Sequence, residues 1–369
     1  MPEFVVPCLF GLEGPTAEEL RRMGAQNVRA ENGRVRFEGG AADCAGANLR
    51  LRTGERVLML LGSFEAASFE ALFEGVKALS LADYIPRDGQ FPVKGYCLNS
   101  ALHSVPDCQR IIKKAAAVSL GRAYRTEWLP ETGDMYQMQF SIIRDRAEIY
   151  LDTTGAALFK RGYRPGHVAA PLRETLAAAL VGFARYRGRD DFYDPFCGSG
   201  TIAIEAALIA RNRAPGLNRS FSAEKWAFAP AAVWSEARQQ AQSLEYHGEY
   251  HIFASDADPR AVALSRENAR RAGVESDITF SVADARAFAP RGDAGVIVTN
   301  PPYGERMLEK QQAQELMAQF GRTMESFPGF RKFIISSDAD FERCYGRRAD
   351  KKRKLYNGML QCNLHMYFQ

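Results

Sequence analysis

The 369-residue sequence lacks any apolar run long enough to cross a membrane. Its longest runs, such as Val57 to Gly62, fall far short of the ~20 residues that a spanning helix needs. The first residues lack the basic start and apolar core of a secretory signal, so we expect a cytoplasmic protein without a membrane partner. The formal net charge is only +4, which by itself indicates no polyanionic partner. Binding to a nucleic acid would therefore depend on local clusters of basic residues.

Paired cysteine motifs are also missing. No two cysteines are spaced as Cys-x-x-Cys, and their number is odd, which argues against both a zinc cluster and a disulfide framework. We expect buried thiols and no metal. The seven are Cys8, Cys44, Cys97, Cys108, Cys197, Cys344 and Cys362.

The chain divides into segments with different patterns, and it has no internal repeat. Residues 3–9 read as a strand, a helix follows through Leu20, and Asn32-Gly33 marks a tight hairpin, which together predict a small α+β unit. Mixed helices and strands over 45–154 predict a second α+β unit. After an irregular stretch near residue 165, strands alternate with long helices, which is typical of an α/β, doubly wound, mainly parallel sheet.

The strongest chemical signal is an apolar strand that ends in a glycine turn and opens into a helix, residues 192–205. Gly198 and Gly200 have no Cβ, so a ligand can approach the backbone closely at this strand end. The turn lacks the lysine of a phosphate-binding loop and the full G-x-G-x-x-G fingerprint of a dinucleotide site. The sequence therefore predicts a ligand pocket of another kind.

Two acids follow the next two predicted strands. Asp256 is placed to bind the two ribose hydroxyls of an adenosyl ligand, and Asp284 to accept from its adenine amino group. For Asp284 a helix-cap role is an equal alternative, whereas Asp258, which precedes a proline, reads simply as a cap. The residues expected at the cofactor are Asp194, Pro195, Cys197, Gly198, Ser199, Gly200, Thr201, Asp256, Ala257, Asp284, Ala285 and Asn300.

The fourth predicted strand, residues 295–299, ends at Asn300-Pro301-Pro302-Tyr303. Two prolines make a rigid, extended turn. The Asn300 side-chain oxygen and the Pro301 carbonyl could accept both hydrogens of an exocyclic amine, and Tyr303 could stack on its base. Holding those hydrogens aims the nitrogen lone pair at a methyl group supplied by S-adenosylmethionine. We read Cys197 as lining the cofactor, not as a nucleophile.

These motifs resemble those of the THUMP-domain class I RNA methyltransferases, and more closely the bacterial enzymes that form N2-methylguanine in large-subunit ribosomal RNA. The resemblance covers nearly the whole chain. It rests on segments 194–201, 300–306 and 354–362, with further matches at 14–20, 34–37, 103–107, 111–114, 161–164 and 170–176. It implies a Rossmann-like methyltransferase domain over 166–369, preceded by a ferredoxin-like region (1–44 and 150–165) and a THUMP domain (45–155).

The resemblance also implies RNA, most simply ribosomal RNA or a ribosome precursor, as the partner. The helix between residues 107 and 125 is distinctly basic, and a run of seven basic residues with one acid lies between Arg343 and Lys354. A solvated charged surface is the alternative for any one of them. The residues expected to contact RNA are Arg110, Lys113, Lys114, Arg161, Tyr163 and Arg164. For Tyr163, packing at the hinge between the domains is an equal alternative.

The sequence thus predicts an S-adenosylmethionine-dependent RNA guanine-N2 methyltransferase, with 23S ribosomal RNA as the expected substrate. Three alternatives stay open at this point. They are a tRNA guanine-N2 methyltransferase, an adenine-N6 methyltransferase acting on DNA, and an RNA-binding ribosome-assembly factor with a vestigial cofactor site. The oligomeric state does not follow from the sequence.

Overall fold

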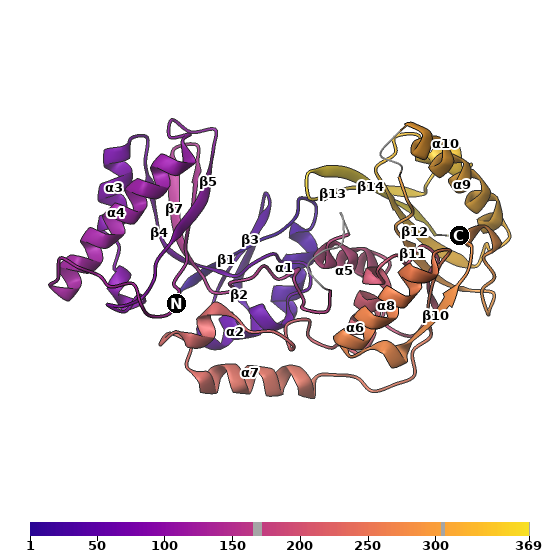
Figure 1. The fold of residues 1–369 in the computed structure, drawn as a ribbon, viewed down its shortest axis with the longest axis horizontal. Coiled ribbons are helices and arrows are strands. Elements are labelled where there is room, and N and C mark those ends of the chain that lie inside the picture. The colour runs from indigo at the N-terminus through magenta and orange to yellow at the C-terminus, as the bar shows by residue number, and fades with distance from the viewer. Residues whose placement is uncertain (165–171, 304–306, 369) are drawn as a thin grey trace.

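The computed structural model describes residues 1–164, 172–303 and 307–368. Within them the chain builds two seven-stranded sheets at opposite ends of an elongated molecule (Figure 1). No helix in these ranges is both long and apolar enough to span a membrane. Five of the seven cysteines are buried, and Cys97 and Cys344 are half-buried, which differs from the expectation that all would be buried.

The front sheet has the strand order β2-β3-β1-β4-β7-β6-β5. Its strands are β1 (Glu3–Pro7), β2 (Gln26–Glu31), β3 (Arg34–Glu38), β4 (Leu58–Glu65), β5 (Val93–Leu98), β6 (Met138–Ile143) and β7 (Arg146–Asp152). The helices of this half are α1 (Glu13–Arg22), α2 (Ala41–Arg50), α3 (Phe69–Lys77) and α4 (Val105–Tyr124). The predicted Asn32-Gly33 hairpin is confirmed, and a second tight turn at Arg144-Asp145 joins β6 to β7.

The two expected front units share this one sheet, because β4 pairs on both sides. Val5 of β1 lies opposite Leu58, and β7 pairs with β4 along its whole length. Residue 44, where we expected the first unit to end, falls inside α2. The expected boundary between 165 and 166 lies outside the residues that the structure describes.

The rear sheet has the order β10-β9-β8-β11-β12-β14-β13 and is parallel except for β14, which confirms the doubly wound α/β prediction. Its strands are β8 (Phe192–Asp194), β9 (Ile252–Asp256), β10 (Ile278–Val282), β11 (Gly295–Thr299), β12 (Phe330–Ser336), β13 (Lys351–Asn357) and β14 (Leu360–Tyr367). Its helices are α5 (Glu174–Phe183), α6 (Thr201–Ala210), α8 (Pro259–Ala272), α9 (Met307–Glu325) and α10 (Phe341–Tyr345).

An arm between α6 and β9 ties the two halves together. It carries α7 (Ala231–Ser243), which packs under α2 (Figure 1). Trp226 of this arm is buried in the front core, stacks on Tyr136 with ring centroids 4.9 Å apart, and donates to the carbonyl of Met135 at 3.0 Å. A large aromatic side chain buried this way fixes how the halves meet.

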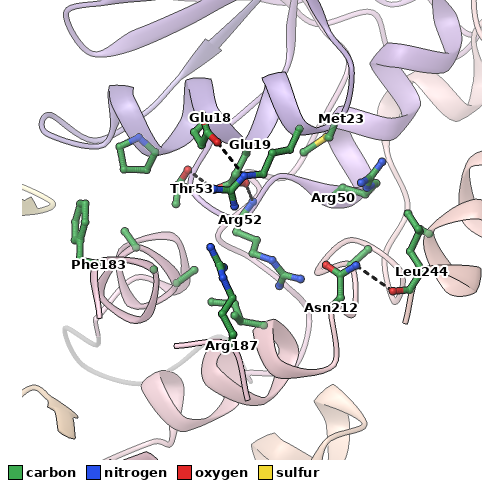
Figure 2. A pocket seen from close by; sticks show the side chains of 18 residues that line it. Glu18, Glu19, Met23, Arg50, Arg52, Thr53, Phe183, Arg187, Asn212 and Leu244 are labelled. Carbon is green, nitrogen blue, oxygen red and sulfur yellow. Dashed lines mark hydrogen bonds and ion pairs between the residues drawn. The ribbon is translucent and has the colours of Figure 1, made fainter. Parts of the chain in front are cut away.

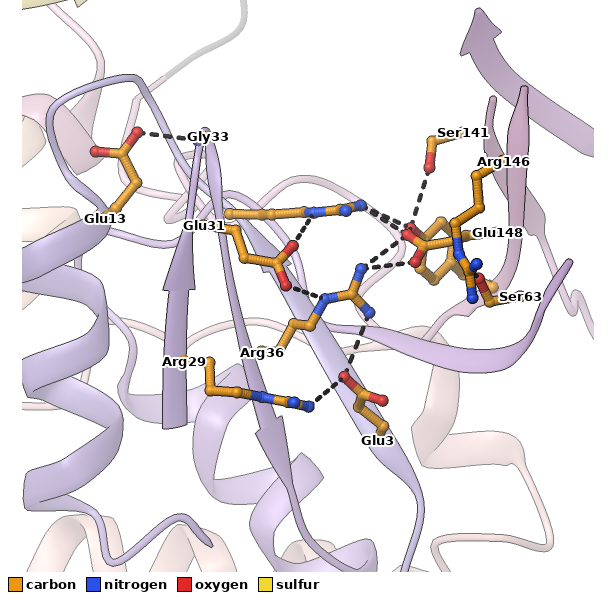
Figure 3. Close-up of polar contacts among 12 residues, drawn as sticks. Glu3, Glu13, Arg29, Glu31, Gly33, Arg36, Ser63, Ser141, Arg146 and Glu148 are labelled. Atoms are coloured by element: carbon orange, nitrogen blue, oxygen red, sulfur yellow. Dashed lines mark hydrogen bonds and ion pairs between the residues drawn. The ribbon is translucent and has the colours of Figure 1, made fainter. Parts of the chain in front are cut away.

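Charged side chains on the front sheet form a network that joins strands far apart in the sequence (Figure 3). Arg36 of β3 donates to both carboxylate oxygens of Glu148 of β7, at 2.7 and 2.9 Å, and also to Glu31 at 2.7 Å. The Arg36 and Glu148 side chains are 8% and 9% exposed, so this is a buried ion pair. Removing one partner from such a pair leaves an uncompensated buried charge.

We expect Glu148→Gln to lower the free energy of unfolding by about 3 kcal/mol, because Arg36 loses its buried counter-charge. Denaturant unfolding at neutral pH measures this. Glu18→Gln, which removes an exposed pair with Arg22, should cost about 0.5 kcal/mol or less. Equal losses in the two variants would contradict the importance of the buried pair.

The pair should also give a pH dependence. Burial alone would raise the Glu148 pKa, but the Tyr150 hydroxyl and the charges of Arg34 and Arg36 outweigh it and lower that pKa. The Glu148 contribution is therefore present above the unfolded value of about 4.3 and is lost as the pH falls through the lower native value. In Glu148→Gln, denaturant unfolding at decreasing pH should no longer show this loss of stability.

Candidate active site

The turn between β8 and α6 holds an open backbone cradle. Gly198 and Gly200 have φ values of +51° and +81°, a region that favours glycine. A Cβ on Gly198 would meet nothing within 4 Å, whereas one on Gly200 would lie 3.0 Å from the Ser265 Oγ. Space for a ligand is therefore open above Gly198, and Gly200 allows close packing of the turn against α8.

Two buried residues of α8 hold the turn from behind. The Ser265 hydroxyl donates to the Gly198 carbonyl at 2.8 Å, and the Asn268 amide donates to the Ser199 carbonyl at 2.9 Å. Sequence reasoning missed both, since α8 reads as an ordinary amphipathic helix. The signal that could have found them is two small polar residues on its otherwise apolar buried face.

A cavity of about 440 Å³ opens over this turn. That volume falls in the usual range of about 300–1,000 Å³ for small-molecule sites. The lining residues come from the glycine turn, the start of α8 and the end of β11. They are Leu172, Asp194, Phe196, Cys197, Gly198, Ser199, Thr201, Ile202, Asp258, Arg260, Ala261, Leu264 and Asn300.

The ends of β8 and β11 meet at this cavity. The two strands are parallel neighbours, with Phe192 opposite Val296. Beyond that pair the Thr299 hydroxyl donates to the Asp194 Oδ1 at 2.7 Å, and the next residue, Asn300, lines the cavity. The predicted catalytic turn and the predicted cofactor turn therefore border one space, as the α/β topology requires.

Asp194 is almost completely buried, with 1% of its surface exposed. Burial raises its pKa to about 7, although hydrogen bonds from Thr299 and the Phe196 amide act the other way. Burial likewise raises the pKa of the Cys197 thiol far above its usual value, so Cys197 is not activated as a nucleophile.

The two other predicted cofactor acids are engaged in turns. Asp256 accepts from the amides of Gly198 and Asp258, both at 3.0 Å, so it links the β8 and β9 turns. Asp284 accepts from the backbone amide of Arg286 at 2.8 Å and pairs with the Arg286 guanidinium. It therefore takes the helix-cap role that was the alternative to adenine binding. The contacts predicted with ribose and adenine stay predictions. Asp258 caps α8 as expected, accepting from the Arg260 amide at 2.9 Å.

In the Asn300-Pro301-Pro302-Tyr303 turn, the Tyr303 hydroxyl donates to the Asn300 Oδ1. Pro301 is buried, Pro302 is exposed and Tyr303 is half-buried. Burial, together with the neighbouring Cys362 of β14, raises the Tyr303 pKa. Tyr303 thus holds the predicted acceptor in place, and its predicted stacking on a base stays a prediction. Residues 304–306, which also carry the family resemblance, lie outside the described residues.

The predicted RNA contacts divide into buried and exposed groups. Arg161 and Tyr163 are each 3% exposed and contact Glu205 of α6, at 3.4 and 3.2 Å. Arg161 also donates to the Arg52 carbonyl at 2.6 Å. The structure therefore does not support RNA contact by either residue, because both are buried where the halves join.

Three of the other four predicted RNA contacts already have partners within the chain. Arg164 is paired with Glu174, and Lys113 is paired with Glu131 and lies over the Phe91 ring. Arg110 is exposed but paired with Asp107, and Lys114 is exposed on α4. Lys114 and Arg110 are the ones placed to reach a phosphate.

Comparison with known proteins assigns the chain to a family. Residues 161–366 match a family described as the RMKL-like methyltransferase domain, residues 3–58 the RlmL ferredoxin-like domain, and residues 66–152 the THUMP domain. The chain belongs to the RMKL-like methyltransferases. This confirms the predicted fold class, with ferredoxin-like and THUMP domains before a Rossmann-like methyltransferase domain.

Relatives resemble this methyltransferase along almost its whole length. YpsC of Bacillus subtilis, provisionally named an RNA methyltransferase, is 43% identical over 97% of this chain and 94% of its own. A Listeria monocytogenes structure, described as a predicted N6-adenine-specific DNA methylase, is 42% identical, with a TM-score of 0.94 over 99% of this chain and 96% of that one. SMU.472, a provisionally named methyltransferase in complex with S-adenosylhomocysteine, is 38% identical, with a TM-score of 0.94 over 100% and 98%.

The raised pKa of Asp194 predicts that the stability of the protein depends on pH. Its native pKa of about 7 lies above the ordinary aspartate value of 3.8, so its contribution to stability is full below 3.8 and is lost as the pH rises through 7. Between these values stability should fall by up to about 1.4 kcal/mol per pH unit. Denaturant unfolding of the wild type and of Asp194→Asn from pH 4.5 to 8 should show this slope only in the wild type.

Asp293→Asn is the matched control, because Asp293 is an exposed aspartate of the same domain that precedes β11, at the opposite edge of the sheet from Asp194. It should keep the wild-type slope. A slope that persists unchanged in Asp194→Asn would show that Asp194 is ionised over this whole pH range and that burial does not raise its pKa.

Proposed function

We propose that the protein transfers a methyl group from S-adenosylmethionine to the exocyclic N2 amine of a guanine in RNA, with 23S ribosomal RNA as the substrate. The observation that carries this is the shared cavity in which Asn300 borders the glycine turn of β8. The THUMP match and the RNA methyltransferase name of the B. subtilis relative support RNA as the substrate class.

The residues of the cavity fit S-adenosylmethionine. The open space above Gly198 leaves the backbone accessible, and a Cβ there would enter it. Asp194, Cys197 and Ser199 line the wall beside it. When bound, this cofactor supplies an electrophilic methyl group on a sulfonium. The SMU.472 complex with S-adenosylhomocysteine, the demethylated product, supports the same ligand here.

The chain's own contribution is to hold the attacking amine. The Asn300 oxygen has two lone pairs, so it can accept from the Tyr303 hydroxyl and from one amine hydrogen together. The Pro301 carbonyl would accept the other hydrogen. The Tyr303 bond fixes which way the amide faces, so the acceptor pair is oriented before the substrate arrives. This geometry needs no covalent protein intermediate.

A hairpin beside the catalytic turn supports a nucleic-acid substrate. Asn363 of β14 lies opposite Ser336 at the end of β12, so the β13–β14 turn continues past the sheet edge that bears Asn300. At its tip the Met359 side chain is fully exposed. The basic residues Lys351 and Lys354 lie exposed along the same hairpin. Phosphate groups and an unstacked base match this combination of charge and apolar surface.

Adenine N6 is the second candidate, since the same acceptor pair can hold either amine. The name of the L. monocytogenes relative favours it. Nucleoside analysis of total 23S rRNA, tRNA and DNA from cells with and without the gene separates the candidates. Our proposal expects loss of N2-methylguanosine from 23S rRNA alone. Loss of that nucleoside from tRNA, or of N6-methyladenine from DNA, would contradict it.

Asn300→Ala should reduce methyl transfer by about 100-fold or more, because one of two preorganised acceptors is lost. Cofactor binding, measured by calorimetry with S-adenosylhomocysteine, should be retained. Asn218→Ala, at an exposed asparagine away from the cavity, should behave as the wild type. Full activity of Asn300→Ala would refute the assignment. Absence of cofactor binding in the wild type would instead favour a ribosome-assembly factor.

A further inference from the structure

A second cavity, of about 310 Å³, lies between the ferredoxin-like half and the methyltransferase half (Figure 2). Helix α1 and the residues that follow α2 form one wall, and α5 with the ends of α6 and α7 forms the other. None of its lining residues also lines the cavity over the glycine turn. It is therefore a separate site, and the proposed methyl transfer does not use it.

Arginines from both halves enter this cavity. Arg50 and Arg52 come from the front half and Arg187 from the methyltransferase half, and Figure 2 shows these side chains around the space between the helices. Arg50 is half-buried and Arg187 is exposed. Neither side chain forms a hydrogen bond or ion pair with any residue in the described parts of the chain.

Arg52 is the most constrained of the three. Its Nη2 donates to the carbonyls of Leu208 and Arg213, at 3.2 and 2.9 Å, which anchors the side chain across the interface. Its Nη1 is buried and has no partner. A buried donor without a partner is costly, because it has lost water and gained nothing in exchange. An anion in the cavity would satisfy it.

The acids at the cavity do not neutralise this charge. Glu18 pairs with a fourth lining arginine, Arg22, at 3.0 Å. Glu19 accepts from the Arg52 amide and the Thr53 hydroxyl, both at 2.6 Å, and burial raises its pKa. Burial lowers the pKa of Arg50 and of Arg52, although Glu205 and Glu19 act the other way on Arg52. Four arginines line the cavity against two glutamates, so positive charge is in excess.

Apart from Thr53 and Asn212, the rest of the wall is apolar, with Met23, Phe183, Ile209 and Leu244 among the lining residues. Guanidinium groups bind phosphate through paired, charge-assisted hydrogen bonds. A cavity of this size, with a few converging polar groups on an apolar wall, is typical of a small-molecule site. We propose that it binds a small organic phosphate of mononucleotide size, held by Arg50, Arg52 and Arg187.

Such a ligand would contact both halves of the protein at once. Its phosphate would lie between arginines of the two halves, and its organic part against α5 and α7. Binding should therefore stabilise the way in which the halves meet, in addition to the contacts of the arm that carries Trp226.

The test is calorimetry with GMP, inorganic phosphate and guanosine, in saturating S-adenosylhomocysteine so that the first cavity is filled. GMP should bind the wild type, phosphate more weakly, and guanosine at least tenfold more weakly than GMP. The double variant Arg50→Gln/Arg187→Gln should bind GMP at least tenfold more weakly, with an unchanged melting temperature in the absence of ligand. Both arginines lack partners in the described chain, so the fold does not depend on them.

Arg189→Gln is the matched control, because Arg189 is an exposed arginine two residues from Arg187 that does not line the cavity. It should bind GMP as the wild type does. No GMP binding at millimolar concentration, or an equal loss in the control, would overturn the proposal. So would a short RNA oligonucleotide whose affinity falls in the double variant while GMP does not bind, since the anion would then be an RNA phosphate.

Discussion

The parallel pairing of β8 with β11 is the constraint on which the candidate active site depends. It brings the Thr299 hydroxyl to 2.7 Å from the Asp194 carboxyl group, and so sets Asn300 beside the open backbone of Gly198. Each of those residues ends or follows a strand, where parallel strands place ligand-binding groups at one edge. The buried hydrogen bond between Thr299 and Asp194 thus joins the turn that would accept the amine to the turn that would bind the cofactor.

The front half is attached to the methyltransferase half by contacts of three kinds. The arm with Trp226 packs into the front core, Arg161 reaches from Glu205 to the carbonyl of Arg52, and Arg353 of the β13–β14 hairpin donates to the Gly11 carbonyl at 3.3 Å. RNA held by the front half would therefore meet the catalytic turn at a fixed distance. This is the physical reason to read the two halves as one enzyme.

The sequence predicted the parts of the site that depend on local geometry. A glycine turn after a strand and a double-proline turn take few conformations, so Gly198 and Asn300 could be placed from their neighbours alone. The buried face of α8 marks Ser265 and Asn268 as unusual, but their contacts with the turn depend on how α8 packs behind it, which the sequence does not show. Arg161 was predicted to contact RNA, and its burial could not be foreseen for the same reason, because its partner Glu205 is distant in sequence. The continuity of the front sheet through β4 is likewise a tertiary outcome.

A crystal structure of the protein with S-adenosylhomocysteine tests the central claim most directly. We expect the ligand over the β8–α6 turn, with its amino-acid part against Gly198 and Ser199 and its sulfur facing the Asn300 side chain. Ligand density elsewhere, or a sulfur turned away from Asn300 with no path between them, would contradict it.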